Sequence, residues 1–319
     1  MLLEKNIPED DAQQRVDRYI RRLCPGLSLS RLHHLFRKKE IKVEGRPVDR
    51  NFVLEASQCL RIFGLKEHEL KTFEERTTGW NSPEFKIPIL FEDDDLLVLN
   101  KTPRLPVHPG TGSLPGQTVI EQVSGYLKNA EKWEDSLFKP SLIHRLDKDT
   151  SGVLLVAKSG KALRHWTQAW RENQVNKKYL ALTVGVPSVQ KDTIDSQLHR
   201  VDSKGGGAKS VGGGEGGKRA VTAFKVIEKF EGYALLEVTL YTGRLHQIRT
   251  HLADYGNPIL GDNRYGNFEQ NRLGKGTLGL KRIFLHSHEL KGKDAEGKPW
   301  VFTADLPEDL KNCLDKLRQ

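Results

Sequence analysis

The chain of 319 residues is poor in cysteine and has no long apolar run. Its three cysteines, Cys24, Cys59 and Cys313, are far apart, which excludes a disulfide scaffold and a cysteine-based zinc motif. The longest apolar stretches, such as 153–157, have four or five residues, whereas a membrane-spanning helix requires roughly 20. The sequence becomes acidic at Glu4, so we expect no secretory signal. We therefore expect a cytoplasmic protein that binds no membrane.

Positive charge is in excess. The 51 Lys and Arg residues against 42 Asp and Glu give a formal net charge of +9 and a pI near 9.3. An excess of this kind favours a polyanionic partner without identifying it. The position of the positive charge along the chain is more informative. Residues 15–50 hold eleven basic and four acidic side chains, whereas residues 51–100 are net acidic. The basic block is a local feature.

The basic block has the patterns of a folded unit. Apolar residues recur at helical spacing in the segments 16–23 and 32–36, and serines that can cap a helix precede the second. Strand-like alternation follows at 41–43 and 60–63, with a turn at 44–47. Two short helices and a small strand pair form a compact basic platform.

Residues 13–64 resemble the S4 RNA-binding domain. The resemblance rests on the segment 28–47, SLSRLHHLFRKKEIKVEGRP, which has the helix, tight turn and strand of that family. It implies an RNA contact made by basic residues of the second helix and the turn after it, namely Arg31, Arg37, Lys38 and Lys39. The alternative is an ordinary solvated helix face.

Residues 84–319 are predicted to form a second, larger domain, after a linker at 65–83 that has little periodicity. Strand hairpins are expected where apolar segments flank short turns, at 87–100 and at 221–240. The three aspartates of the first turn lack the spacing of metal ligands. Further strands are predicted at 141–143, 153–157 and 178–184, and helices at 161–173 and 244–255.

One segment, 204–218, has eight glycines in fifteen residues. Because such a run has few side chains to pack, we predict a mobile surface insertion. A phosphate-binding glycine loop is the alternative, but it requires a strand before it and a helix after it, and neither pattern is present.

Two short segments concentrate reactive side chains. Residues 144–152, HRLDKDTSG, gather charge between two apolar strands, as active-site loops do. Asp147 and Asp149 are only two positions apart, which gives poor control over the opposed carboxylates of a glycosidase. In the second segment, 242–251, His246 and His251 are five positions apart and do not share a helix face, which argues against zinc. We predict no metal site.

The order of these segments resembles the pseudouridine synthase family that modifies large-subunit ribosomal RNA and some transfer RNA. The segment 144–152 matches the family's signature, and the resemblance extends over 86–305. Agreement is also found in the segments 92–101, 178–182, 242–249 and 256–262. The chain departs from the family at 102–104, where Pro-x-Gly is usual after the lysine, and in its glycine-rich segment. Both departures bear on substrate choice more than on chemistry.

The resemblance implies a reaction and the residues for it. Forming pseudouridine breaks the N1–C1′ bond of uridine, turns the uracil over and joins C5 to C1′, without oxidation or hydrolysis, so we expect no cofactor. Asp147 is implied as the nucleophile, attacking C1′ or C6, with Arg249 as its ion-pair partner. Tyr179 would stack on the uracil, with its hydroxyl where the C5 proton leaves. Arg145 would fill the gap left when the uridine flips out of its helix.

The sequence thus predicts an α+β protein, in which a small S4-like RNA-binding domain precedes a synthase domain with a mixed, mostly antiparallel sheet and a central cleft. We expect a monomer that acts on RNA, foremost large-subunit ribosomal RNA, and not on DNA. Two other classes stay open. A catalytically inactive RNA-binding protein would keep the basic block but would not need Asp147, Tyr179 and Arg249 together. A nucleoside or glycoside hydrolase would need a second acid and access for water.

Overall fold

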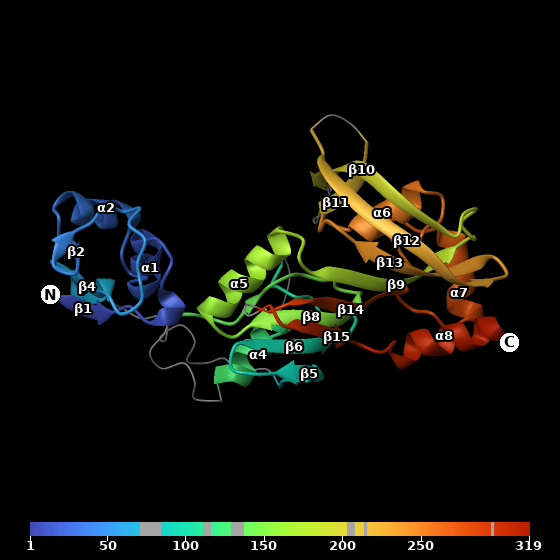
Figure 1. Ribbon diagram of the computed structural model, residues 1–319, viewed down its shortest axis with the longest axis horizontal. Helices are drawn as coiled ribbons and strands as arrows, with labels where there is room; N and C mark the ends of the chain where they lie inside the picture. Colours follow the sequence, from blue (N-terminus) through green and yellow to red (C-terminus); the bar gives the residue numbers. More distant parts are fainter. Residues whose placement is uncertain (71–83, 111–115, 129–136, 203–207, 214–215, 295–296) are drawn as a thin grey trace.

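The computed structural model describes residues 1–70, 84–110, 116–128, 137–202, 208–213, 216–294 and 297–319. The chain folds into a small N-terminal unit and a larger unit, each with its own sheet and hydrophobic core (Figure 1). The N-terminus lies in the small unit and the C-terminus at the far end of the larger one. Within the described ranges, no helix is both long and apolar enough to span a bilayer.

The small unit packs two helices on an antiparallel sheet of order β1-β4-β2-β3. Tyr19 and Leu35 from the helices are fully buried in its core. Ser28 caps α2 by accepting from the Arg31 backbone N–H at 3.3 Å, as the sequence predicts. The elements are β1 (Leu3–Asn6), η1 (Glu9–Asp11), α1 (Val16–Leu23), α2 (Leu29–Arg37), β2 (Ile41–Val43), β3 (Arg46–Pro47), β4 (Cys59–Ile62) and η2 (Glu67–Glu69).

The small unit extends beyond the predicted limits of 13 and 64. Strand β1 pairs with β4, and Ile7 is buried in the same core. At the other end, Leu65 is buried there and Leu70 packs against it, so these residues are part of the unit rather than of a linker. These segments are too short for periodicity to reveal them. The rest of the predicted linker, 71–83, lies outside the described residues.

The larger unit is built on an eleven-stranded sheet of order β11-β10-β12-β13-β9-β14-β8-β6-β5, with β15 beside β14 and β7 beside β8. Of its described strand pairs only β8 and β14 are parallel, so the sheet is mixed and mostly antiparallel, as predicted. The strands are β5 (Ile89–Glu92), β6 (Leu96–Lys101), β7 (Ser141–Leu142), β8 (Ser151–Ala157), β9 (Asn176–Val184), β10 (Lys191–Asp202), β11 (Ala208–Gly212), β12 (Lys218–Phe230), β13 (Tyr233–Leu240), β14 (Leu285–Lys293) and β15 (Pro299–Thr303). The helices are α4 (Val119–Lys128), α5 (Gly160–Arg171), α6 (Gln247–Asp254), α7 (Phe268–Thr277) and α8 (Glu308–Arg318).

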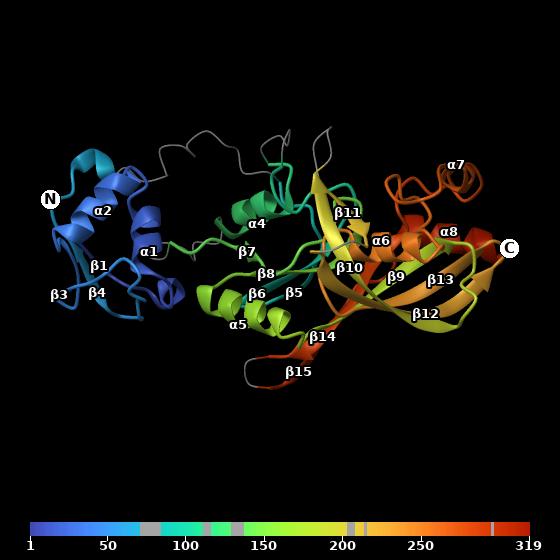
Figure 2. The same ribbon diagram turned by 90° about the horizontal axis from the view of Figure 1, so that it is seen from above.

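Strands β6 and β8 read as continuous apolar runs because both of their faces are covered. Leu97 and Leu154 pack in the cluster that includes residues of α4, α6 and α8. Their neighbours Val98 and Leu155 pack in a second cluster, with Trp166 of α5. Figure 2 shows α4 and α5 on opposite sides of these strands. Because both faces of β8 are packed, the start of this strand is held in place, and with it the end of the loop that precedes it.

Two predictions about this unit require correction. Helix α6 begins at Gln247 rather than at residue 244, because His246 adopts a left-handed backbone with φ of 50°. The glycine-rich segment does not lack packing, since its residues 208–212 form β11, which pairs with β10. Ser210 is buried there, and the absence of a side chain at Gly212 leaves room for the Asp254 carboxylate. Residues 204–207, 214 and 215 of the segment lie outside the described part.

The small unit docks on the start of α5. The Gly160 backbone N–H donates to Asp10 Oδ1 at 2.9 Å, and Arg164 donates to the Ala12 carbonyl at 3.1 Å. A Cβ at Gly160 would clash with the Asp10 carbonyl, so glycine allows this close approach. The Leu137 N–H also donates to Asp11 Oδ2, at 2.8 Å.

Gly152 should be intolerant of any side chain. Its φ is 112°, and a Cβ there would clash with the Ser287 carbonyl of β14. Gly232 provides the control, since it has φ of 75° but no atom within 4 Å of the place that a Cβ would occupy. We expect Gly152→Ala to lower the free energy of unfolding by roughly 1–3 kcal/mol more than Gly232→Ala, because only the first adds overpacking. Urea titration measures both, and equal losses would contradict the close β8–β14 contact.

Candidate active site

Three of the residues predicted from the sequence meet at the middle of the large sheet. Asp147 lies in the loop between β7 and β8, Tyr179 on β9, and Arg249 on α6. Arg249 Nη1 donates to Asp147 Oδ2 at 2.8 Å. The fourth, Arg145, is exposed on the Asp147 loop, and its side chain makes no hydrogen bond to any described residue. The structure thus brings the first three side chains together, and Arg145 is exposed on the same loop as Asp147.

Arg249 is shared between two carboxylates. Its Nε and Nη2 donate to the two oxygens of Asp262, at 2.7 and 2.8 Å, which leaves Nη1 for Asp147. Asp262 is 1% exposed. Burial raises the pKa of Asp262, but the hydrogen bonds from Arg249 and from the backbone N–H groups of Arg264 and Tyr265 outweigh it and hold that pKa below its usual range. The guanidinium is thus fixed before any substrate binds.

Asp262 was missed as a site residue in the sequence. It ends the segment 256–262, which matches the family pattern, so the signal was present but attached to no role. A lone aspartate after a glycine-containing turn is typically a turn residue. Only the fold brings its carboxylate to Arg249.

Asp147 presents one occupied and one open carboxylate oxygen. Oδ2 accepts from Arg249, with His246 Nε2 at 3.8 Å, whereas Oδ1 accepts no hydrogen bond from any described residue. Burial lowers the pKa of His246, although the charge of Asp147 acts in the opposite direction, so this imidazole is neutral at pH 7. Its Nδ1 lies 2.9 Å from the Tyr265 hydroxyl. The contacts of Asp147 with described side chains are therefore made at Oδ2.

The loop that carries Asp147 is anchored from two sides. Lys101 of β6 is fully buried, and its Nζ donates to the carbonyls of Lys148 and Thr150 at 2.9 and 2.8 Å. Burial lowers the pKa of Lys101 to about 7. Arg282 donates to the Asp149 carbonyl at 3.3 Å and forms a bidentate pair with Asp309 of α8. These backbone contacts hold the loop in one conformation.

Tyr179 supplies a buried aromatic ring beside Asp147. It is 5% exposed, and burial raises its pKa to about 12, which the nearby Ser287 hydroxyl partly offsets. Tyr179 and Ser287 are direct partners in the pairing of β9 with β14. The hydroxyl is therefore protonated at neutral pH, and the ring is uncharged.

Other predicted residues have structural positions. His144 stacks on Trp170 with 4.3 Å between ring centroids, and its Nε2 accepts from the Leu155 N–H at 3.1 Å. Burial lowers the pKa of His144 to about 3, so it is a neutral packing residue. The side chain of His251 contacts Ser196 and Thr222. In the described part of the chain, no group of His, Cys, Asp and Glu could hold a metal.

The basic residues predicted to bind RNA lie in the small unit, whereas Asp147 lies in the larger unit. Arg37, Lys38 and Lys39 are exposed at the end of α2. Arg31 instead donates to Glu69 at 3.2 Å and to the Gly64 carbonyl at 2.6 Å. Arg31 thus holds the end of the small unit in place.

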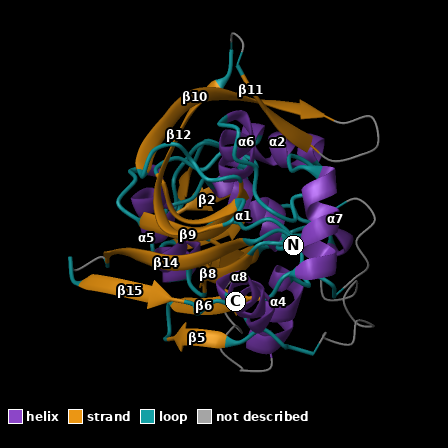
Figure 3. Cartoon of the chain, turned by 90° about the vertical axis from the view of Figure 1, so that its right-hand side faces the viewer, coloured by secondary structure: helices purple, strands orange, loops and turns teal. Residues whose placement is uncertain are grey.

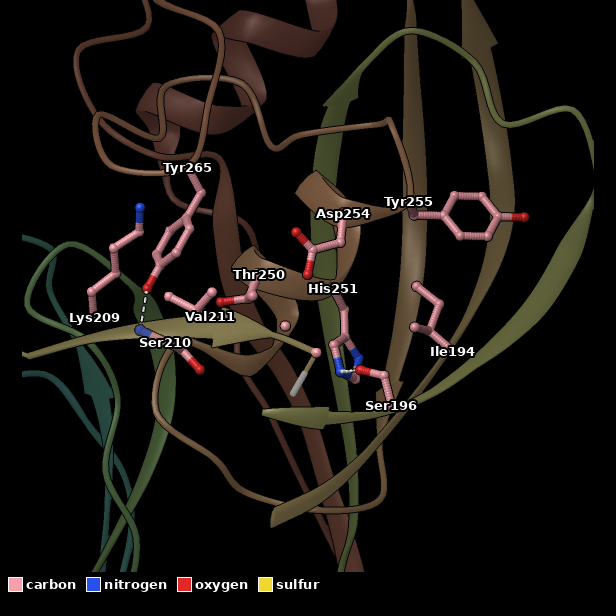
Figure 4. Close-up of a pocket in the computed structure, with 12 residues that line it drawn as sticks. Ile194, Ser196, Lys209, Ser210, Val211, Thr250, His251, Asp254, Tyr255 and Tyr265 are labelled. Carbon is pink, nitrogen blue, oxygen red and sulfur yellow. Dashed lines mark hydrogen bonds between the residues drawn. The ribbon is translucent and has the colours of Figure 1, made fainter. Parts of the chain in front are cut away.

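A pocket of about 460 Å³ adjoins the site without containing Asp147, Tyr179 or Arg249 among its described lining residues. It lies between the β10–β11 ribbon and α6, and Tyr265 lines it (Figure 4). The Tyr265 hydroxyl accepts from the Ser210 N–H at 2.7 Å, and the Arg249 guanidinium lies 5.1 Å from the centre of the Tyr265 ring. Tyr265 therefore links the ribbon to the Arg249 pair.

Comparison with known proteins finds relatives that cover most of the chain. The family model described as RNA pseudouridylate synthase matches residues 95–254. Ribosomal large subunit pseudouridine synthase C of Escherichia coli (strain K12) is 36% identical over 319 residues, covering 98% of this chain and 95% of the relative. The protein of the same name from Vibrio parahaemolyticus is 33% identical, with 98% and 96% covered. The solved structure of Human RNA Pseudouridylate Synthase Domain Containing 4 superposes with a TM-score of 0.59 at 29% identity, over 72% of this chain and 92% of that one.

Removing the shared guanidinium should destabilise the fold. In Arg249→Ala the Asp262 carboxylate would stay buried without a partner, which costs roughly 3–5 kcal/mol of unfolding free energy. Arg318→Ala is the control, because its pair with Glu228 is surface-exposed and should contribute less than about 1 kcal/mol. Urea denaturation compares the two variants. An Arg249→Ala midpoint equal to that of the control would show that Asp262 is not buried as an ion.

Proposed function

The chain belongs to the RNA pseudouridylate synthase family, and from that premise we propose that it isomerises specific uridines of 23S (large-subunit) ribosomal RNA, with Asp147 as the nucleophile. It is an enzyme of the isomerase class, an RNA pseudouridine synthase. The observation that supports the role of Asp147 best is its open Oδ1 beside the fixed Arg249. The relatives named for ribosomal large-subunit modification support the choice of RNA.

The sharing of Arg249 between Asp147 and Asp262 suits a nucleophile that loses its negative charge when it reacts. Attack by Oδ1 at C1′ of a flipped-out uridine breaks the N1–C1′ bond, whose electron pair leaves with the uracil, whereas attack at C6 breaks the C5–C6 π bond and moves that pair into the uracil ring. In either case Asp147 changes from a carboxylate to a neutral ester and the negative charge passes to the base. Arg249 keeps its bidentate pair with Asp262 throughout, so no unpaired cation is left in the buried site. When the adduct breaks down, the carboxylate returns to the same Nη1 donor.

Tyr179 and Arg145 have complementary roles in this proposal. The uncharged Tyr179 ring stacks on the detached uracil while it turns over, and the hydroxyl lies on the side from which the C5 proton leaves. The exposed Arg145 fills the space that the flipped uridine leaves in its helix, where five N–H donors can bond the unpaired base.

The surroundings of Asp147 favour an isomerase over a hydrolase. A glycoside hydrolase needs a second carboxyl group that can act as an acid or base across the scissile bond. Both oxygens of Asp262 accept from Arg249, and the Asp149 side chain is exposed. Neither is placed for that role, which supports transfer within the substrate.

We assign RNA docking to the small unit, the S4-like domain predicted at 13–64. Arg37, Lys38 and Lys39 are proposed to contact phosphates, whereas Arg31 stabilises the unit through the nearly buried Glu69. The enzyme acts in this proposal as a cytoplasmic monomer without a cofactor, and its partner is RNA rather than DNA or a membrane.

The nucleophile is tested by Asp147→Asn. The amide keeps the shape but removes the attacking charge, so turnover should vanish while RNA affinity stays within a few-fold. Release of tritium from C5-labelled uridine in 23S ribosomal RNA measures turnover, because an isomerase liberates that proton and leaves the chain uncut. Asp149→Asn, next to it in the loop, should remain active. Substantial release by Asp147→Asn would refute the role of Asp147.

Docking is tested by the salt dependence of RNA binding. Each phosphate contact contributes about 0.7–0.9 to the slope of log affinity against log salt, so replacing Arg37, Lys38 and Lys39 by Ala should flatten the slope by roughly 2–3. Arg31→Ala should instead lower the melting temperature without this change of slope. Parallel salt curves for the triple variant and the parent would mean that the face is only solvated.

A further inference from the structure

Helix α7 carries an aromatic and cationic stripe on its outer face. Phe268, Arg272 and Lys275 are spaced at i, i+4 and i+7, which places them on one side of the helix. Phe268 is 82% exposed, more than any other large apolar side chain in the described ranges. Such exposure leaves the ring face open to a ligand.

The inner face of α7 is fixed to the site. Asn271 donates from Nδ2 to the Asp262 carbonyl at 2.9 Å and accepts at Oδ1 from the Gly261 N–H at 2.7 Å. Gly274 packs on Leu260, and the Tyr233 hydroxyl donates to Gln270 at 3.2 Å. The helix is thereby tied to the backbone of the carboxylate that holds Arg249. Its outer stripe keeps a set position relative to Asp147.

The charge of this face is uncompensated. Neither Arg272 nor Lys275 has a hydrogen bond or ion pair to any described side chain. Between residues 264 and 281 the only acidic residue is Glu269, against four basic ones, Arg264, Arg272, Lys275 and Lys281. A single open ring beside two cations is typical of proteins that stack nucleic-acid bases and neutralise phosphates.

The position of α7 agrees with an RNA path across the molecule. Figures 2 and 3 show α7 on the same side as α4 and as α2, the helix of the small unit that ends in exposed basic residues. The loop with Asp147 and the α6 helix with Arg249 belong to the larger unit between them. One polyanion can therefore reach both ends of this side.

We propose that the stripe of Phe268, Arg272 and Lys275 binds an unpaired nucleotide of the substrate RNA outside the reacting uridine. The Phe268 ring stacks on its base, and the two cations contact the neighbouring phosphates. The inference rests on the proposed function, whose RNA substrate it extends to a second contact. It makes α7 a determinant of which uridine is presented to Asp147.

Phe268→Ala tests the stacking contact directly. Binding of 23S ribosomal RNA transcript is measured by filter retention in the Asp147→Asn background, so that turnover does not interfere. Losing one base–aromatic stack should weaken binding roughly 5- to 100-fold. Phe268→Trp should retain affinity because an indole also stacks. Leu273→Ala is the matched control, since Leu273 is 50% exposed on the same helix but lies off the stripe.

The cations are tested through salt dependence. Arg272→Ala with Lys275→Ala should reduce the slope of log affinity against log salt by about 1.4–1.8. The pair Lys298→Ala and Lys311→Ala removes the same charge from exposed positions off the stripe and should leave the slope unchanged.

The outcomes separate the two hypotheses. Unchanged RNA affinity of Phe268→Ala overturns the α7 contact and leaves the isomerase assignment intact. Lack of tritium release by the unaltered protein refutes the proposed function instead, and the binding data are independent of it. If Phe268→Ala changes only the sedimentation of the protein, the stripe contacts protein and the RNA contact is refuted.

Discussion

The site depends on one buried guanidinium that two carboxylates must share. Desolvating Arg249 costs several kcal/mol unless its donors are satisfied, and Asp262, 1% exposed, satisfies most of them. Asp262 in turn needs donors of its own, which the backbone of Arg264 and Tyr265 supplies. The turn between α6 and α7 is therefore ordered by the same charge pair that orients Asp147. Chemistry and local fold cannot be separated here.

Much of the fold was accessible from the sequence, because its signals are local. The hairpin around the aspartate turn and the one around Gly232 form as expected, since turn residues and strand patterns lie side by side in the chain. Strand β11 was not predicted, because its glycines leave no side-chain pattern to recognise. It pairs with β10 through backbone groups, which the sequence does not show. Strand β1 was missed because its partner, β4, lies more than fifty residues away.

The candidate site was also only partly predictable from the sequence. The motifs directed attention to Asp147, Tyr179 and Arg249, and the structure gathers all three, but their supports could not be read from the chain. A lysine in a strand is expected to be solvated, yet the Lys101 ammonium group donates to carbonyls nearly fifty positions away in the chain. Arg282 donates to the Asp149 carbonyl of the loop and pairs with Asp309 of the distant helix α8. Such roles depend on which backbone atoms meet, and no residue pattern encodes that.

The contact between the two units has a consequence for how such a chain can diversify. It combines the main-chain carbonyls of Glu9, Asp10 and Ala12, which accept from Arg164, with the carboxylates of Asp10 and Asp11, which accept from the Gly160 and Leu137 N–H groups. Main-chain groups are the same whatever side chains they carry. Glu9 contributes only its carbonyl and can therefore change while the path of the chain is kept, whereas Asp10, Asp11, Gly160 and Arg164 are constrained by their contacts. A joint that constrains so few side chains leaves the rest of the small unit able to change while the larger unit and the residues around Asp147 stay the same.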